Sequence, residues 1–242
     1  MCGIVGLINK NKDAQKEVIT AMSSRVIHRG PDGHGLHLYK QFGIAHRRLS
    51  FIDVEGGAQP LCNEDGSIWI SYNGELYNFQ DLRLELEKLG HIFKTKSDTE
   101  VIIHAYEEWG TDCPKRFQGM FAFVIYNSDN GEVFCCRDRA GVKPFYYYIA
   151  DGLFLFSSEL KSFHQHKRFE KKLNLASVSA FMQYGNVPTP HCIFQNTYKL
   201  KPGHFLSFNT SQELNEDLVN PMRQKCYWNV YDSYNKPKLG IS

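Results

Sequence analysis

The chain has 242 residues, of which 42% are hydrophobic and 14% aromatic, and its 28 basic and 26 acidic residues give a formal net charge of +2. This length is enough for one large domain with a substantial core, and the balanced charge gives no reason to expect nucleic acid or an anionic membrane surface as a partner. No run approaches the roughly 20 apolar residues of a membrane span and residues 1–12 lack a secretory signal pattern, so with seven cysteines and no CxxC pair we expect a cytoplasmic protein with reduced thiols.

Periodic hydrophobicity predicts alternating strands and helices in the first half of the chain. We expect strands at 3–8, 35–39, 42–47 and 67–72, and helices at 14–27, 78–89 and 98–109. Ser97 is a suitable N-cap for the last of these helices, with Glu100 as its capping-box partner.

The second half carries two hairpin signals, at 127–131 and 150–152. We expect strands at 120–127, 132–137, 145–149, 153–157 and 203–208, and helices at 159–164 and 175–184. Cys135 and Cys136 are adjacent in a strand, so their side chains should point to opposite faces. The polar tail at 209–242 is expected to pack poorly. Together these elements predict an α+β fold in which helices cover the outer sides of two antiparallel sheets.

The chain opens with Met1, Cys2 and Gly3, a combination that suits catalysis. After removal of Met1, Cys2 would carry both a thiol and a free α-amine. A thiol is nucleophilic as the thiolate, and an α-amine titrates near roughly 7.7–8.0, so the amine can act as general base, as in hydrolases with an N-terminal threonine. The alternative is that Cys2 only begins a buried strand.

A thiolate that attacks an amide needs hydrogen-bond donors for the oxyanion that forms. Asn73 and Gly74 offer a side-chain amide followed by a backbone N–H that can approach closely, because glycine has no side chain. The same pair is also a strong signal for a type I′ hairpin turn. The residues alone leave both interpretations open.

An amide substrate that is an amino acid also needs charged partners. Arg47 or Arg48 can hold the α-carboxylate through the guanidinium fork, and Glu75 and Asp98 can hold the α-ammonium. Structural alternatives are a surface arginine and an acidic residue that complements a helix start. The alternating charges at 137–143 indicate a structural salt-bridge network, because the P-loop pattern of a phosphate site is absent.

The ten histidines show no metal-ligand spacing such as HExxH, so the sequence predicts no metal site. We interpret His28, His34, His37 and His46 as structural or hydrogen-bonding residues.

A series of motifs runs in order along the chain. They are MCGIVG at 1–6, HRGPDGHG at 28–35, AHRRLSFIDVEGGAQPL at 45–61, YNGELYNFQDLR at 72–83, KSDTEVIIHAYEEWG at 96–110, GMFAFVIY at 119–126, RDRAGVKPFYY at 137–147 and FSSELK at 156–161. With these motifs the chain resembles the glutaminase domain of glutamine-hydrolysing asparagine synthetases. That domain is a class II glutamine amidotransferase, an N-terminal-nucleophile (Ntn) hydrolase with a four-layered αββα sandwich.

The resemblance implies a role for each candidate residue. Cys2 would be the nucleophile, and Asn73 with Gly74 would form the oxyanion hole. The resemblance selects Arg48 over Arg47 for the α-carboxylate. Glu75 and Asp98 would hold the α-ammonium of glutamine. One further residue, Arg29, is expected to shape the loop near the site.

The resemblance covers residues 1–208, which we expect to form the amidotransferase domain, with 209–242 as a linker toward an ATP-dependent synthetase domain. The SGGxDS pattern of that second domain does not occur in the 242 residues. An excised domain, a short subunit with a separate partner and a truncated product all fit this pattern.

The implied substrate is L-glutamine, and the implied partner is the synthetase domain or subunit. No cofactor is expected for this domain, since ATP and Mg²⁺ act in the synthetase. A homodimer is compatible with the resemblance. Three functions stay open: hydrolysis that feeds asparagine synthesis, hydrolysis that feeds another acceptor such as a sugar or peptide, and a remnant without turnover.

Overall fold

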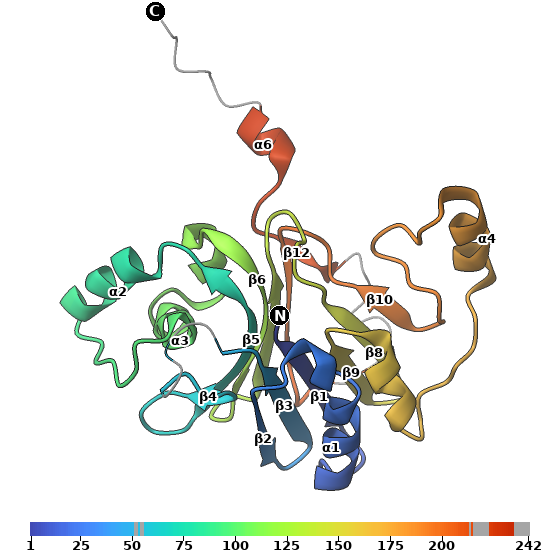
Figure 1. Cartoon of the computed structure of the whole chain (residues 1–242), viewed down its shortest axis with the longest axis horizontal. Helices are drawn as coiled ribbons and strands as arrows, with labels where there is room; N and C mark the ends of the chain where they lie inside the picture. The colour runs from blue at the N-terminus through green and yellow to red at the C-terminus, as the bar shows by residue number, and fades with distance from the viewer. Residues whose placement is uncertain (51–52, 54–55, 213, 215–222, 235–242) are drawn as a thin grey trace, which may run out of the picture.

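The computed structural model describes residues 1–50, 53, 56–212, 214 and 223–234. Two six-stranded sheets form the centre of the molecule (Figure 1), and every strand pair within them is antiparallel. The first sheet has the order β10 (Thr197–Lys199), β8 (Tyr146–Ala150), β9 (Leu153–Ser157), β1 (Gly3–Asn9), β3 (Phe42–Arg48) and β2 (Gly33–Tyr39). The second has the order β12 (Lys225–Cys226), β11 (His204–Asn209), β7 (Glu132–Arg137), β6 (Gly119–Asn127), β5 (Ile68–Leu76) and β4 (Leu61–Cys62).

Helices cover the outer face of each sheet. The α-helices are α1 (Lys16–Ser24), α2 (Phe79–Lys88), α3 (Asp98–Trp109), α4 (Leu175–Tyr184) and α6 (Val230–Tyr234), and the 3₁₀ helices are η1 (Ile27–Arg29), η2 (Gly110–Arg116) and η3 (Leu160–Gln165). In Figure 1, α2 and α3 lie outside the sheet that contains β5 and β6, and α1 lies outside the sheet that contains β1. The layers therefore follow an αββα order, which confirms the predicted fold class.

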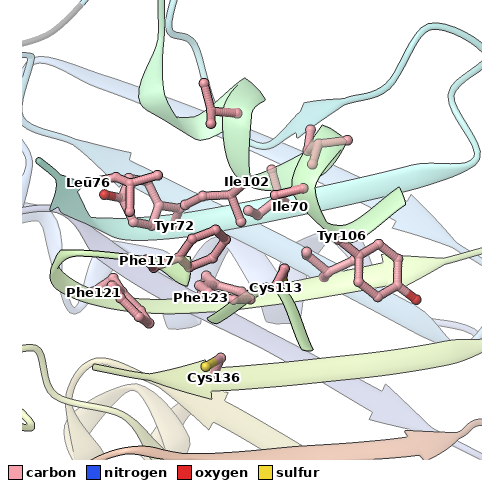
Figure 2. Close-up of a cluster of buried hydrophobic side chains, with 14 of the residues drawn as sticks. Ile70, Tyr72, Leu76, Ile102, Tyr106, Cys113, Phe117, Phe121, Phe123 and Cys136 are labelled. Atoms are coloured by element: carbon pink, nitrogen blue, oxygen red, sulfur yellow. The ribbon is translucent and has the colours of Figure 1, made fainter. Parts of the chain in front are cut away.

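The two-residue period of the strands separates three apolar layers. On β7, Cys135 belongs to the cluster between the sheets, whereas Cys136 belongs to the cluster beneath α3. This confirms the expected opposite orientation of the two cysteines. Figure 2 shows the cluster beneath α3, where Tyr72 of β5 and Phe123 of β6 pack below Ile102. A third cluster joins the first sheet to α1 and η3.

The tail is packed more closely than its composition suggests. Strand β12 pairs with β11, and Tyr227 is buried in the cluster beneath α3. The Tyr227 hydroxyl donates a hydrogen bond to the carbonyl oxygen of Arg137 at 2.8 Å. The expectation of poor packing is therefore wrong for residues 223–228, because an aromatic ring finds a place in the core. Residues 213, 215–222 and 235–242 of the predicted linker lie outside the described residues.

Most predicted elements are confirmed, and the differences are local. The segment predicted as a helix at 159–164 forms the 3₁₀ helix η3, and the strand predicted at 67–72 continues to Leu76. Strands β4, β10 and β12 are two or three residues long, which is too short for a periodic pattern. Among the described residues, no helix is both long and apolar enough to cross a membrane.

Helix α3 begins as predicted, but Glu100 has a different role. Ser97 is the N-cap, and its hydroxyl accepts a hydrogen bond from the Thr99 N–H at 3.1 Å. The Glu100 carboxylate does not complete a capping box. It accepts backbone N–H groups from Lys94 and Thr95, both at 2.7 Å, and so holds the loop before the helix.

Replacement of this carboxylate, Glu100→Gln, should destabilise the protein in a pH-dependent way. Burial disfavours the charge of Glu100, but the nearby His104 ring, with Nε2 at 3.9 Å, and hydrogen bonds from Thr95 and the loop outweigh it and lower the pKa to about 2. The carboxylate therefore stabilises the fold above about pH 4.5, and this contribution is lost as the pH falls toward 2. We expect the variant to lose about 2–3 kcal/mol of unfolding free energy at pH 7, measured by urea denaturation.

At pH 3 the difference between Glu100→Gln and the parent protein should shrink. Glu17→Gln, at an exposed position of α1, is the control and should match the parent at both pH values. An equal deficit of Glu100→Gln at pH 7 and pH 3 would contradict the electrostatic explanation.

Candidate active site

A single cavity of about 190 Å³ brings together the predicted catalytic and substrate-binding residues. Its walls are formed by Met1, Cys2, Arg48, Leu49, Gly57, Gln59, Tyr72, Asn73, Gly74, Glu75, Ser97, Asp98, Thr99, Met120 and Lys143. The strand register explains part of this arrangement, because Gly3 of β1 pairs with Arg47 of β3. Cys2 and Arg48 therefore lie at the same end of two neighbouring strands in the first sheet. The second sheet contributes the end of β5.

The Cys2 thiol is partly buried at this end of the sheet. Its Sγ accepts a hydrogen bond from the Leu49 N–H at 3.4 Å and also lies 3.7 Å from the Leu49 carbonyl oxygen. Burial raises the pKa of the Cys2 thiol, although the Leu49 N–H and the Arg48 charge act in the opposite direction. The resting group is therefore a protonated thiol at neutral pH, and it needs a base before it can attack.

Arg29 does not line the cavity, but it binds the backbone of Cys2. Its Nε donates a hydrogen bond to the Cys2 carbonyl oxygen at 2.9 Å, and its guanidinium forms an ion pair with Glu159 at 3.1 Å. Only 9% of the Arg29 side chain is exposed. Arg29 therefore lies beside the backbone of Cys2, and its part in shaping the loop near the site stays a prediction.

Asn73 and Gly74 lie within β5, so the hairpin-turn interpretation is wrong. They pair with Ala122 and Phe121 of β6 in extended backbone. A Cβ atom on Gly74 would lie 2.5 Å from the Met120 carbonyl oxygen and 2.8 Å from the Phe121 Cα. The close approach of β6, and not a turn, is therefore the reason for glycine at this position.

The Asn73 side chain leaves a donor available. Asn73 is 1% exposed, and its Nδ2 has no hydrogen-bond partner among the described residues. A buried donor without a partner is costly in a folded protein. Because Asn73 lies on the cavity wall, a ligand in the cavity can supply the hydrogen-bond acceptor for Nδ2.

Two carboxylates lie on the side of the cavity formed by β5 and α3. Asp98 is 4% exposed and accepts hydrogen bonds from the Tyr72 hydroxyl at 2.9 Å and the Leu76 N–H at 3.1 Å. Burial raises the pKa of Asp98. Burial and the charge of Asp98 raise the pKa of Glu75, against the effect of Lys143. A cationic group placed beside this pair would relieve both charges.

The side chains of Arg47 and Arg48, neighbours on β3, point in different directions. The Arg47 guanidinium turns away from the cavity and donates hydrogen bonds to the Ser23 hydroxyl at 3.0 Å and the Ser23 carbonyl oxygen at 3.3 Å. Arg48 lines the cavity, and one of its terminal N–H groups donates to the Asp53 carbonyl oxygen at 2.6 Å. The structure thus places Arg48, as the resemblance implied, where a ligand can reach it.

Several wall residues were missed at the level of sequence. Tyr72 orients Asp98, and Gln59 accepts the Tyr72 N–H at 2.7 Å while its amide donates to the Thr99 hydroxyl at 3.3 Å. Lys143 is 5% exposed and also forms part of the cavity wall. No sequence motif groups these three residues as parts of one site, since they lie far apart in the chain.

The segment at 137–143 is structural, but not through the predicted salt bridges. The Asp138 carboxylate accepts backbone N–H groups from Phe121, Ala140, Val142 and Lys143 at 2.9–3.2 Å. The Arg137 guanidinium donates to the carbonyl oxygens of Gly141, Lys143 and Leu200, each at 2.7 Å. Both charges therefore hold backbone groups of a tight loop, and this loop positions Lys143 at the cavity.

Three of the four histidines interpreted as structural have the expected contacts. His46 is buried, and its Nδ1 lies 2.9 Å from the Ser71 hydroxyl. Burial lowers the pKa of His46 to about 3, so its ring is neutral. His37 stacks on Trp69 with ring centroids 3.6 Å apart, and His28 Nε2 lies within hydrogen-bond distance of Glu159 Oε1, at 2.8 Å.

Solved structures confirm the fold. Glutamine phosphoribosylpyrophosphate amidotransferase from Bacillus subtilis aligns with a TM-score of 0.63 and 20% identity, over 86% of this chain and 47% of that chain. A second structure, described as the allosteric regulatory enzyme of purine biosynthesis, aligns with a TM-score of 0.65 and 19% identity, over 94% of this chain and 49% of that chain.

Sequence relatives are closer. Asparagine synthetase (glutamine-hydrolyzing) 3 from Bacillus subtilis is 37% identical over 95% of this chain and 37% of its own length. Asparagine synthetase (glutamine-hydrolyzing) 1 from the same organism is 39% identical over 84% of this chain and 33% of its own length. The chain thus spans little more than a third of these curated relatives.

The family described as "Glutamine amidotransferase domain" matches residues 1–219, nearly the whole of the chain. This match and the relatives agree with the cavity described above. The chain therefore belongs to the glutamine amidotransferase domain family and is an enzyme of that class.

Proposed function

We propose that this chain hydrolyses L-glutamine to glutamate and ammonia, and that the ammonia serves an ATP-dependent synthetase domain or subunit that makes asparagine from aspartate. One observation carries the first half of the proposal. The cavity combines a thiol, an unpartnered amide donor, a guanidinium and two carboxylates. The second half is supported by relatives that are named asparagine synthetases and are much longer than this chain.

The charges of the cavity suit both ends of an amino acid. In this proposal Arg48 binds the α-carboxylate of glutamine, and Glu75 with Asp98 binds the α-ammonium. Because burial raises the pKa of both carboxylates, an ammonium beside them is favourable. The side-chain amide then extends toward Cys2, with its carbonyl oxygen near Asn73 and the Gly74 N–H.

The chemistry proceeds through a covalent intermediate. Once Met1 has been removed, the α-amine of Cys2 accepts the thiol proton, and the thiolate attacks the side-chain carbonyl carbon of glutamine. Asn73 Nδ2 and the Gly74 N–H stabilise the oxyanion. The C–N bond breaks, the amine returns the proton, and ammonia leaves. Water then attacks the γ-glutamyl thioester on Cys2, releasing glutamate and the thiol.

No cofactor takes part in these steps. The proposal places ATP and Mg²⁺ in the synthetase partner, where aspartate is activated. Met1 forms part of the cavity wall, so its removal both frees the α-amine and enlarges the space for substrate.

The first test is glutamate release from glutamine by the purified chain, with the intact mass of the same sample. We expect turnover together with loss of Met1. Addition of a synthetase partner, aspartate, ATP and Mg²⁺ should then yield asparagine. Glutamate release without any asparagine would point to a different ammonia acceptor, and no release from a chain with a free Cys2 amine, with or without partner, would overturn the proposal.

Arg48→Lys should raise KM for glutamine by about 10–100-fold with a smaller change in kcat. Lysine keeps the charge but loses the fork that binds a carboxylate at two points, and a charge-assisted hydrogen bond contributes about 1.5–3 kcal/mol. Arg47→Lys is the matched control, because the Arg47 guanidinium binds Ser23 outside the cavity. Steady-state kinetics that give the same KM for both variants would contradict the assignment of Arg48.

A further inference from the structure

A second group of titratable residues lies where the connection after α2 meets α3. We call it the histidine–glutamate cluster, and it consists of His91, His104, Glu64, Glu100, Glu107 and Glu108. None of these residues forms the wall of the glutamine cavity. His104 is nearly buried, with 2% of its side chain exposed, whereas the side chains of His91 and Glu107 are 16% and 22% exposed.

Three atoms of this cluster form a compact triangle. His104 Nδ1 lies 2.8 Å from Glu107 Oε2 and 3.2 Å from His91 Nδ1, and His91 Nδ1 lies 3.6 Å from Glu107 Oε2. Two ligand atoms on a tetrahedral ion with zinc-like bonds lie about 3.3 Å apart. The three distances surround this value, so the triangle has the size of one face of a tetrahedral site.

The remaining polar atoms orient these three ligands. His91 Nε2 faces Glu108 Oε2 at 3.3 Å, and His104 Nε2 lies 3.5 Å from Glu64. The second oxygen of Glu107 accepts a hydrogen bond from the Asn63 amide at 2.9 Å. Histidines that bind metal commonly direct their other ring nitrogen at a carboxylate, and ligating carboxylates are hydrogen-bonded in turn.

Without a metal, the three atoms of the triangle must share protons. If His104 Nδ1 donates its proton to Glu107, the nearby His91 Nδ1 either shares that proton or directs a second N–H at the first ring. His104 Nε2 is buried and makes no hydrogen bond among the described residues. A divalent cation at the triangle would engage all three lone pairs and would leave both outer nitrogens protonated toward carboxylates.

We propose that His91 Nδ1, His104 Nδ1 and Glu107 Oε2 bind one divalent transition-metal ion, with zinc as the best match. Two imidazoles and one carboxylate form a donor set that zinc accepts, with water at the fourth position. The partly exposed His91 and Glu107 leave that position open to solvent. The ion would fasten the segment after α2 to α3, the helix whose first residue is Asp98 of the glutamine cavity.

This proposal departs from the expectation of no metal site. The sequence shows no paired motif, because His91 lies in the connection between α2 and α3 and His104 lies thirteen positions later on α3. Only His104 and Glu107 share a helix face, at positions i and i+3. The fold supplies the third ligand.

Metal binding can be tested without any measurement of turnover. The chain carrying Cys2→Ala, which removes the active-site thiol as a competing ligand, is stripped with a chelator and titrated with Zn²⁺ against a chromophoric indicator, and with Co²⁺ by visible absorption. We expect one ion per chain and a rise in the thermal unfolding midpoint. Addition of His91→Gln should abolish binding, whereas His191→Gln, an exposed histidine outside the cluster, should leave it intact.

Glu108→Gln provides a graded variant. It alters only the carboxylate that faces His91 Nε2, so zinc affinity should fall by about 10–100-fold without loss of stoichiometry. Circular dichroism of each stripped variant checks that the fold is retained. Equal binding by the His91→Gln and His191→Gln chains would overturn the proposal, as would a folded parent chain that takes up no zinc at micromolar concentrations.

Discussion

Cys2→Ala is expected to reduce glutamate release from glutamine to the level of an enzyme-free blank. The variant removes the atom on which the γ-glutamyl thioester forms, and no other group on the cavity wall can replace a thiolate. Stability should change by less than about 1 kcal/mol, because the side chain is small and only partly buried. Loss of activity would therefore report on chemistry and not on folding.

The matched control for this variant is Cys62→Ala. Cys62 is also partly buried and unpaired, but it lies on β4 outside the cavity, so full activity is expected. An electrophilic glutamine analogue should add its mass to the parent chain and to Cys62→Ala, but not to Cys2→Ala. Turnover by Cys2→Ala above the blank would show that Cys2 is not the nucleophile.

Asn73→Ala should lower kcat by about 10²–10³-fold, the usual effect of losing one oxyanion donor. Because Asn73 Nδ2 has no hydrogen-bond partner among the described residues, removal of this donor breaks no hydrogen bond of the resting protein. We therefore expect the unfolding free energy to stay within about 1 kcal/mol of the parent value. Activity and stability would respond very differently to this one substitution.

Ser71→Ala is the control on the same face of β5, two residues earlier. Its hydroxyl contacts His46 Nδ1 at 2.9 Å in the buried layer between the sheets. This variant should lose about 1–3 kcal/mol of stability with kcat nearly unchanged. If Asn73→Ala instead lost stability with little change in kcat, Asn73 would be a structural residue and the oxyanion assignment would be wrong.

Much of the fold was predictable because local patterns agree with tertiary packing. Helix α3 occupies the predicted range 98–109, since its cap and its apolar spacing mark the same boundary. Strand β7 alternates faithfully, and Cys135 and Cys136 accordingly enter different layers. Tyr227 is the counterexample, because a polar tail with a few aromatic residues gives no sign of which ring will reach the core.

The site was predictable only where chemistry left a mark on the sequence. Cys2 directly follows the initiator methionine, and Asn73-Gly74 is a recognisable pair. The pair resembles a turn in the sequence, but in the structure it lies within strand β5. Gln59 and Lys143 reach the same cavity from separate loops. Their positions depend on the pairing of strands from two sheets, which no short pattern encodes.

The place of β1 in its sheet has a consequence for how the enzyme matures. This first strand lies between β3 and β9, and the Ser158 N–H donates a hydrogen bond to the Ile4 carbonyl oxygen at 2.9 Å. During synthesis, β3 can pair with β1 early, but the other edge of β1 must wait until residues 153–157 leave the ribosome. Until then β1 lies at the edge of an incomplete sheet. A fusion tag ahead of Cys2 would extend from the start of β1 at the cavity wall and would keep the Cys2 nitrogen in a peptide bond, so purification tags belong at the other end of the chain.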